Sequence, residues 1–395
     1  KGQARKGGDI VIGRDEESGT LAKWTDVSTA RLESQGGFVE TSGDVLKADG
    51  VSVKAADWLL DPYNIVISTT TSGTAYNDPN SGGTYTYTPS AISNILATDI
   101  QNSLNNGTNV KITTGLSGSA GSDAGNITVA GNITKSAGGA ATLALEANNA
   151  IIFNNGVTVS GSSSSGNLNV NLTANGAASS GSSVVFNSLS KLDVNGQVTI
   201  NATSKIAGSS GSTAAVYVYA GDLTSSNTGG SRTLIRGSSL TINTFNSGAG
   251  GYGLFTKNVA GFESTSGDLS ITSTFTGGTG TTGGSGIWIG SDWSALGPTG
   301  GTPANPYIKS AGKLNLQTIT NGTLAIGSIV LSDAVTTAAS DISISAQSQR
   351  ADQPAVTIST TFNAPKVQST SGNVTIQWLE LKLPALLGQQ PPAET

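Results

Sequence analysis

The amino-acid sequence predicts an all-β solenoid, a fold in which short strands stack as successive coils. Gly, Ser, Thr and Asn make up nearly half of the 395 residues, aliphatic residues alternate with polar ones in short runs, and a turn-and-strand motif recurs. Glycine, β-branched and turn-forming polar residues are poor helix formers. The chain also differs from disordered proteins, which combine low hydrophobicity with many charges, because 36% of its residues are hydrophobic and only 11% are charged.

The recurring motif is a Gly followed by Asn or Asp and then by alternating aliphatic and polar residues. Gly and Asn tolerate the positive φ of a tight corner, and the alternation places every second side chain on one face. Three copies share a longer Thr-Ser-Gly corner, so the chain contains a degenerate internal repeat. The clear copies begin at Gly8, Gly125, Gly166, Gly267 and Gly372.

Strands this short bury too little apolar surface to offset the entropy cost of ordering a single coil. Stacked coils, about 4.8 Å apart, share backbone hydrogen bonds and join their aliphatic side chains into columns, which favours a solenoid over a sandwich. We expect one domain of about 15 coils, each of roughly 20 to 25 residues, over residues 1–377. Residues 378–395 are expected to form an edge strand and a flexible tail.

Three segments depart from this pattern and are expected as insertions. Apolar residues recur with a period near 3.6 in residues 89–105, which predicts a short helix, capped at Thr88 and ended at Asn105-Asn106-Gly107. The apolar residues of this period are Ile92, Ile95, Leu96, Ile100 and Leu104. Residues 69–87 and 277–307 are predicted as loop insertions because they are rich in Gly, Pro and aromatic residues.

Charge and composition exclude several classes of function. Twenty basic and 25 acidic residues give a net charge of -5, and the single basic cluster, at the amino terminus, is too small for nucleic-acid binding, so no nucleic-acid partner is expected. Cys and His are absent, which excludes disulfides and leaves no metal site or cofactor predicted. Met is absent too, and we expect the chain to be a processed piece of a longer product.

The sequence assigns no catalytic residue. Without His or Cys, catalysis would need paired carboxylates, a Ser-Lys pair or a carboxylate-bound metal. Acidic residues are sparse in the middle of the chain, and several of them occupy turn positions, where their side chains cap the backbone. A β-helical enzyme would need several acids with Lys or Arg on one face of adjacent coils.

Three aromatic residues of the 277–307 segment are the candidate ligand-binding residues: Trp288, Trp293 and Tyr307. Exposed aromatic residues in loops favour sugar rings or protein partners. The alternative is that Trp288, within Gly286-Ile287-Trp288-Ile289-Gly290, belongs to a strand and simply packs on the solenoid.

Candidate glycosylation sites follow from the Asn-X-Ser/Thr acceptor sequence. A turn before a strand selects the same residues on packing grounds, so a structural role is the alternative. These sequences occur at Asn106, Asn126, Asn132, Asn171, Asn201, Asn321 and Asn373.

Near the carboxy terminus, leucines alternate with charged residues before Pro384. This pattern predicts an edge strand whose unpaired backbone caps its own solenoid or docks on the first coils of a neighbour, which would form a homopolymer through the ends. The residues of this candidate assembly strand are Trp378, Leu379, Leu381 and Leu383.

The segment Gly36-Gly37-Phe38-Val39-Glu40-Thr41-Ser42-Gly43, followed by Trp58-Leu59-Leu60-Asp61-Pro62, resembles the repeat region of bacterial two-partner secretion exoproteins, the family of filamentous haemagglutinin and the high-molecular-weight adhesins. The close resemblance covers about the first 115 residues, and the remainder is similar in composition and rhythm. It implies a right-handed parallel β-helix, exported to the Gram-negative cell surface with the help of an outer-membrane secretion partner. The family's amino-terminal secretion domain is not found, so we expect an internal or carboxy-terminal stretch of the shaft.

The function expected from these observations is that of a secreted, non-enzymatic adhesin or fibre protein that displays loops on a rigid shaft. Its expected partners are surface glycans or proteins of a host or of bacteria. The first alternative is a β-helical carbohydrate-active enzyme. The second is the stalk of a contact-dependent toxin delivery protein.

Overall fold

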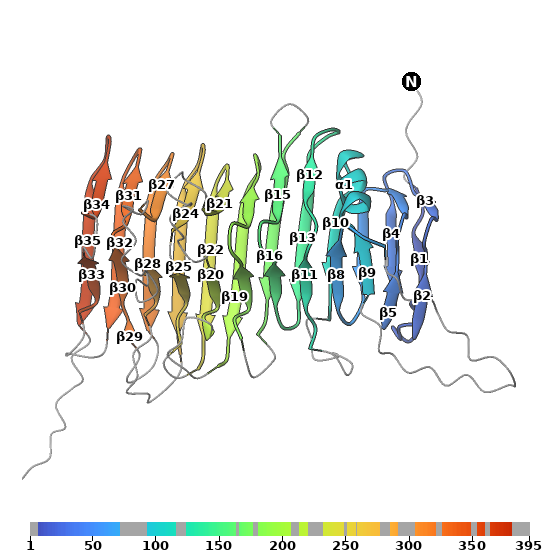
Figure 1. Ribbon diagram of the computed structural model, residues 1–395, viewed down its shortest axis with the longest axis horizontal. Helices are drawn as coiled ribbons and strands as arrows, with labels where there is room; N and C mark the ends of the chain where they lie inside the picture. Colours follow the sequence, from blue (N-terminus) through green and yellow to red (C-terminus); the bar gives the residue numbers. More distant parts are fainter. Residues whose placement is uncertain are drawn as a thin grey trace, which may run out of the picture.

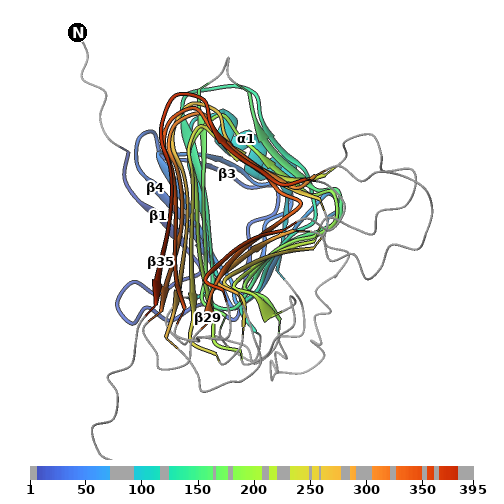
Figure 2. The same ribbon diagram turned by 90° about the vertical axis from the view of Figure 1, so that its left-hand side faces the viewer.

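The computed structural model describes residues 7–71, 93–115, 124–162, 166–176, 181–206, 213–219, 232–248, 251–257, 259–276, 285–290, 305–320, 326–348, 354–359 and 364–380. These residues form a parallel β-helix, in which most coils contribute a strand to each of three sides that enclose one core (Figure 2). The coils stack along the long axis from the amino-terminal to the carboxy-terminal end (Figure 1). The all-β solenoid expected from the sequence is therefore confirmed.

The first sheet has twelve parallel strands, with one short antiparallel strand, β29 (Ile326–Gly327), against β32. Its parallel strands are β1 (Ile10–Ile12), β4 (Phe38–Ser42), β7 (Asp57–Asp61), β10 (Asn109–Thr113), β13 (Ala141–Ala147), β16 (Leu168–Ala174), β19 (Val198–Ser204), β22 (Leu240–Asn246), β25 (Leu269–Phe275), β28 (Leu314–Thr320), β32 (Ile342–Ser348) and β35 (Val374–Glu380).

The second sheet also has twelve strands. In spatial order they are β2 (Trp24–Asp26), β5 (Val45–Lys47), β9 (Ser93–Leu96), β8 (Ile65–Ser68), β11 (Ile127–Val129), β14 (Ile151–Phe153), β17 (Val184–Phe186), β20 (Val216–Tyr219), β23 (Leu254–Lys257), β26 (Ile287–Ile289), β30 (Ile329–Ser332) and β33 (Val356–Ser359).

The third side begins with a two-stranded sheet, β3 (Arg31–Glu33) and β6 (Ser52–Lys54), and continues after helix α1 (Ala97–Asn105) as the eight-stranded third sheet. The strands of this sheet are β12 (Ile133–Lys135), β15 (Thr158–Gly161), β18 (Lys191–Asp193), β21 (Thr233–Gly237), β24 (Ala260–Ser264), β27 (Tyr307–Ser310), β31 (Val335–Ala338) and β34 (Lys366–Ser369).

Twelve parallel strands in the first sheet correspond to twelve coils, fewer than the 15 expected. The coils are accordingly longer than the sequence suggested, and they vary in length. Ala141 of β13 pairs with Leu168 of β16, whereas Val198 of β19 pairs with Leu240 of β22, which lies much further along the chain. Because the extra residues lie in the connections between strands, the strand register is kept while coil length changes.

Helix α1 takes the place of a strand on the third side, where it contacts both β6 and β12. Two side chains of the helix accept hydrogen bonds from the backbone of β12 and of the residue after it. The Gln101 Oε1 accepts the N–H of Thr134 at 3.0 Å, and the Asn105 Oδ1 accepts the N–H of Ser136 at 2.9 Å. A helix bonds its own backbone groups internally, so it can interrupt a sheet only if side chains satisfy the neighbouring strand.

The helix begins at Ala97 and not at residue 89, although its end at Asn105 agrees with the sequence pattern. Residues 93–96 instead form β9, which lies between β5 and β8 and pairs with both. Backbone pairing on two sides and the burial of Ile95 outweigh the helical spacing of the apolar residues. The expected cap at Thr88 lies outside the described residues.

The other two expected boundaries also need correction. The 277–307 segment is not one loop, because it contains β26, and Tyr307 opens β27. Residues 277–284 and 291–304 of this segment lie outside the described part of the chain. The same is true of residues 72–87 of the other insertion. The last coil does not end at residue 377, since β35 continues to Glu380 and pairs with β32 along its whole length.

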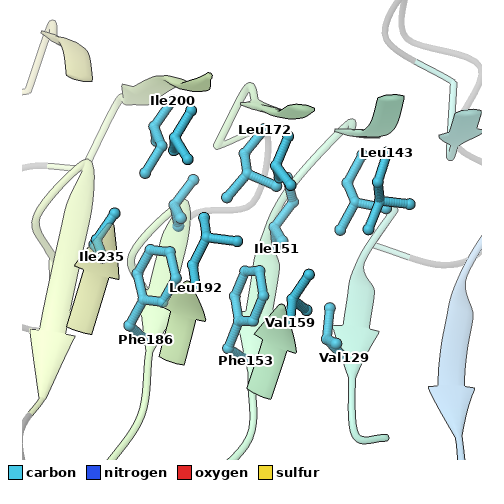
Figure 3. Packing of buried hydrophobic residues seen from close by; sticks show 14 of the residues in the cluster. Val129, Leu143, Ile151, Phe153, Val159, Leu172, Phe186, Leu192, Ile200 and Ile235 are labelled. Carbon is cyan, nitrogen blue, oxygen red and sulfur yellow. The ribbon is translucent and has the colours of Figure 1, made fainter. Parts of the chain in front are cut away.

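The core is a continuous column of aliphatic side chains with few aromatic rings (Figure 3). Within β13, Ala141, Leu143, Leu145 and Ala147 are buried and the alternate side chains face outward. Phe153 and Phe186 stack in consecutive coils with ring centroids 4.6 Å apart. Alternation with period two therefore directs aliphatic residues inward from coil to coil, as the sequence predicts.

Each turn-and-strand motif begins a strand of the first or second sheet at its aliphatic residue: β1, β11, β16, β25 and β35 begin in this way. The corner glycines differ in their role. Gly125 and Gly166 have the positive φ expected, +80° and +93°. Gly372 does not, and there a Cβ would lie 2.5 Å from the Asp341 Oδ1, so close approach between coils requires the glycine.

Candidate functional site

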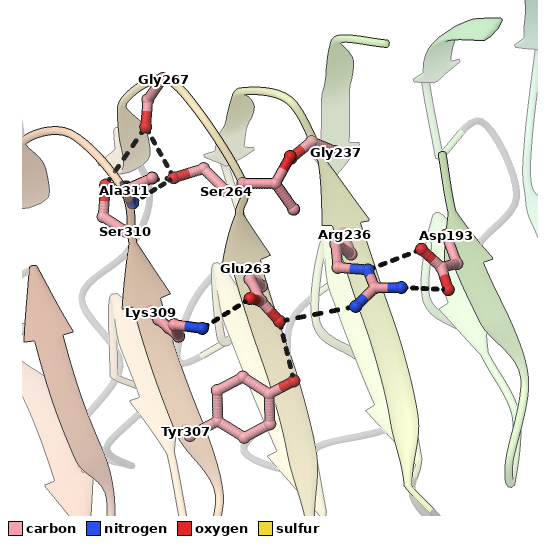
Figure 4. Close-up of polar contacts among 11 residues, drawn as sticks. Asp193, Arg236, Gly237, Glu263, Ser264, Gly267, Tyr307, Lys309, Ser310 and Ala311 are labelled. Carbon is pink, nitrogen blue, oxygen red and sulfur yellow. Dashed lines mark hydrogen bonds and ion pairs between the residues drawn. The ribbon is translucent and has the colours of Figure 1, made fainter. Parts of the chain in front are cut away.

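The third sheet carries a line of charged residues on its outer surface, one from each of four adjacent coils (Figure 4). The Arg236 guanidinium binds Asp193 through two bonds, Nε to Oδ1 at 2.6 Å and Nη2 to Oδ2 at 2.7 Å. On its other side, Glu263 lies 4.0 Å from Arg236 and receives a bond of 3.0 Å from the Lys309 Nζ. Acid and base therefore alternate along the coil axis.

Tyr307, one of the aromatic residues selected from the sequence, belongs to this charged line and not to a free loop. Its Oη donates to the Glu263 Oε2 at 3.4 Å, and the Arg232 guanidinium lies over its ring, 4.7 Å from the centroid. Burial and then the charge of Glu263 raise the pKa of the Tyr307 phenol, so it stays protonated at neutral pH. The bond to Glu263 and the cation over the ring hold Tyr307 against the charged line.

The charged line is balanced by its own internal pairs. Hydrogen bonding to Asp193 raises the pKa of Arg236 despite partial burial, and the guanidinium remains charged. Each carboxylate faces at least one cation on a neighbouring coil, which makes the arrangement a stabilising ladder between coils.

The second sheet carries an aromatic group on its outer surface, which contains Trp288, the second residue selected from the sequence. Trp288 lies on β26 with its ring centroid 6.0 Å from that of Phe255 and 6.3 Å from that of Tyr252. Phe255 in turn stacks on Tyr217 at 6.1 Å. Trp293, the third selected residue, lies outside the described residues.

This aromatic group continues an apolar row that crosses six coils in register. The row contains Ile152, Val185, Tyr217, Phe255, Trp288 and Val330. Phe255 and Val330 are buried and Trp288 is partly buried, so the row forms a packed layer on the outside of the sheet. The sequence signal for Tyr217 was the alternation Val216-Tyr217-Val218-Tyr219, which places both tyrosines on one face.

The first sheet presents an outer surface without charge from β16 to β32, which we call the neutral face. Its outward positions carry Thr, Ser, Asn or Gln, with Phe245 and Ile319 as the two exceptions. The neutral face consists of Asn169, Asn171, Thr173, Thr199, Asn201, Thr203, Thr241, Asn243, Phe245, Ser270, Thr272, Thr274, Asn315, Gln317, Ile319, Ser343, Ser345 and Gln347.

Some side chains of the neutral face bond from coil to coil. The Asn243 Nδ2 donates to the Asn201 Oδ1 at 3.0 Å, and the Asn315 Nδ2 donates to the Ser270 Oγ at 3.3 Å. Charged side chains appear on this sheet only outside the neutral face, as in the pair Lys111 and Glu146 at 2.7 Å, within the described residues.

The candidate glycosylation residues occupy two kinds of position. Asn126 and Asn132 bond between coils: the Asn126 Oδ1 accepts from the Asn149 Nδ2 at 2.7 Å, and the Asn132 Oδ1 accepts the N–H of Thr158 at 2.8 Å. The following residues are exposed: Asn132, which is exposed as well as bonded, Asn106 at the helix end, Asn171 and Asn201 on the neutral face, and Asn373 before β35. Asn201 also accepts the bond from Asn243 on the next coil. Asn321 lies outside the described residues.

The carboxy-terminal coil exposes positions that are buried in the coil beside it. Ile376 and Trp378 of β35 are in register with the buried Ile344 and Ala346 of β32, yet Trp378 is 69% exposed. Leu379 belongs to the same strand, whereas Leu381 and Leu383 lie outside the described residues. The last coil is thus the edge of the stack in the described part of the chain.

The described residues contain neither a candidate metal cluster nor a candidate membrane-spanning helix. No three acidic residues gather closely enough to hold a metal ion, and no helix is long and apolar enough to cross a membrane.

The two segments that resemble the secretion exoproteins are neighbours in the structure. Val39 of β4 pairs with Trp58 of β7, and the buried Trp58 Nε1 donates to the Thr41 Oγ1 at 3.0 Å. The residues of this motif are therefore spaced for packing between adjacent coils. No family model and no curated protein matches the chain.

Proposed function

We propose that this chain is part of a secreted, non-enzymatic surface protein, a rigid shaft whose outer faces bind surface glycans or proteins of a host or of bacteria. The observation that carries the proposal is the continuous stack of twelve coils around one aliphatic core. Such a stack fixes length and surface spacing, because each coil is held by the coils on both sides.

The resemblance of residues 36–43 and 58–62 to two-partner secretion exoproteins supports the same proposal. Their packing as adjacent coils gives the motif a structural reason to recur in shafts of this kind. On this proposal the protein reaches the Gram-negative cell surface through an outer-membrane secretion partner.

Assembly through the ends belongs to the same proposal. The apolar side chains exposed on the last coil favour docking on a further coil, as does the outer edge of β35, which pairs with no second strand among the described residues. Negative-stain microscopy of the purified chain would show end-joined filaments, and removal of residues 378–395 would leave single rods. Filaments that persist after this deletion would contradict a role for Trp378 and Leu379 in docking.

An enzyme acting on carbohydrate is the second candidate, because the charged line places Asp193, Arg236, Glu263 and Lys309 on one face of adjacent coils. The internal pairing of these residues and the protonated Tyr307 favour the shaft instead.

One experiment separates the two candidates. Beads coated with the purified chain are tested for attachment to epithelial and bacterial cells, and the same chain is incubated with polysaccharides while released reducing ends are measured. The proposal expects attachment and no release. Sustained release that disappears in Glu263→Gln would establish the enzyme, and coated beads that attach no better than uncoated beads would refute the adhesive role.

A further inference from the structure

The neutral face differs from the other two sides of the β-helix in the kind of ligand that it can take. Protein surfaces normally carry many charged side chains, and the third sheet does so through Asp193, Arg236, Glu263 and Lys309. Six consecutive strands of the first sheet, β16 to β32, have no charged residue at an outward position. A charged ligand therefore finds no opposite charge to pair with at the outward positions of this face.

The groups that replace charge are hydroxyls and amides, which both donate and accept hydrogen bonds. They recur in register from coil to coil, for example Thr199, Thr241 and Ser270 in one row and Asn201 and Asn243 in the next. With about 4.8 Å between coils, six strands extend for about 24 Å. A ligand that is itself uncharged, rich in hydroxyls and repetitive along its length matches this surface.

Phe245 adds a second, independent feature. It is 39% exposed at an outward position of β22, in register with Thr203 on one side and Thr274 on the other. The exposed part of this ring gains nothing from burial in the fold, so contact with a ligand would bury further apolar surface. Sugar rings carry C–H groups on their faces and pack on aromatic rings, while their hydroxyls bond to polar neighbours.

We infer that the neutral face binds an uncharged polysaccharide, with one sugar ring on Phe245 and its hydroxyls bonded to the Thr and Asn side chains around it. The inference names a site and a ligand class for the proposed adhesive function and rests on that proposal. The hydrogen bond from Asn243 to Asn201 holds these two amides in position, which lowers the ordering cost of binding.

The test is electrophoresis of the full chain through native gels that contain a soluble polysaccharide. Dextran, glucomannan, galactomannan and mixed-linkage β-glucan are the neutral probes, and alginate and polygalacturonate are the acidic ones. We expect retardation by at least one neutral probe that high salt does not change. Phe245→Ala should weaken it about tenfold, and Thr272→Lys, which brings a charge to the centre of the face, should abolish it.

Thr337→Lys is the matched control, because Thr337 faces outward on β31 of the third sheet. It should bind as the unchanged chain does, and all three variants should keep the melting temperature of the unchanged chain. Three results would overturn the inference: no retardation by any neutral probe, retardation by acidic probes alone, or retardation of Phe245→Ala equal to that of the unchanged chain. Cell attachment that persists in such a case would leave the adhesive function standing and place it on another surface.

Discussion

Replacement of Phe153 by Ala should lower the free energy of unfolding by about 3–5 kcal/mol, the range for removal of a large buried aromatic side chain. Phe153 is 1% exposed and Phe186 is 0% exposed, and their rings stack at 4.6 Å with planes inclined by 13°. The strands that carry them are bonded to coils above and below. The backbone therefore cannot collapse into the cavity, and the upper part of the range applies.

A double-mutant cycle separates the ring pair from burial. Phe186→Ala should cost as much as Phe153→Ala, and the double variant should cost less than the sum by about 0.5–1.5 kcal/mol, the contribution of a stacked aromatic pair. Phe245→Ala is the matched control, because that ring is 39% exposed, and it should cost less than about 0.5 kcal/mol.

The assay is urea unfolding followed by far-ultraviolet circular dichroism, with the slope and the midpoint fitted for each variant. We expect the midpoint to fall while the slope, which reports the surface exposed on unfolding, stays constant. A loss below about 1 kcal/mol for Phe153→Ala would refute the tightly packed core. A reduced slope would show that the stack unfolds in separate blocks, contrary to one continuous core.

Three further predictions concern a corner, a carboxyl group and the charged line. Gly166→Ala should lower the free energy of unfolding by about 2–3 kcal/mol, because φ is +93° and a Cβ would lie 2.5 Å from a backbone carbon. Gly156→Ala, at φ +71° with open space around it, should lower it by about 1 kcal/mol. Equal losses of stability in urea unfolding would contradict the clash at Gly166. Burial raises the pKa of Asp61 from 3.8 to about 6, so the folded state favours its protonated form. The stability from this group is complete below pH 4 and is lost, by about 3 kcal/mol, as the pH rises through about 6. Asp61→Asn should flatten this part of the stability profile, and an unchanged profile would assign the pH dependence to other groups. Arg236→Gln should cost about 1 kcal/mol in low salt and less in high salt, since the side chains of Arg236 and Asp193 are partly exposed; a loss independent of salt would point to packing instead of charge.

The features that the sequence predicts correctly depend on neighbouring residues in the chain. Alternation in Ala141–Ala147 shows which side chains enter the core, and the Gly-Asn pair before Leu168 shows where a strand starts. Both follow from local rules, the period of a strand and the φ range of glycine. The end of α1 at Asn105 is local in the same sense.

The features that the sequence does not predict depend on which coils meet. Ile95 and Leu96 fit a helical period, and only pairing with β5 and β8 makes them a strand. Asp193, Arg236 and Glu263 form the charged line although unequal lengths of chain separate them, because connections of different lengths lie between the paired strands. No fixed spacing in the sequence connects such residues. The candidate surfaces can therefore be found only from the strand register, which the sequence alone does not supply.

The three sides of the β-helix carry different kinds of outward side chain, because the fold restricts outward positions less than inward positions. Inward positions are mostly aliphatic, although a few carry buried polar residues such as Thr244 and Asn246. Corners must allow sharp turns, but an outward side chain on a stacked strand needs only to fit its neighbours above and below. Charge pairs satisfy that need on the third sheet, aromatic contacts on the second, and hydroxyl and amide groups on the neutral face. Since each solution stabilises the stack, stability does not explain why the neutral face carries hydroxyl and amide groups in place of the charge pairs of the third sheet. Phe245 makes the distinction sharper, because this apolar residue stays 39% exposed on that face. A role in binding accounts for both observations, and the Phe245→Ala variant separates that role from stability.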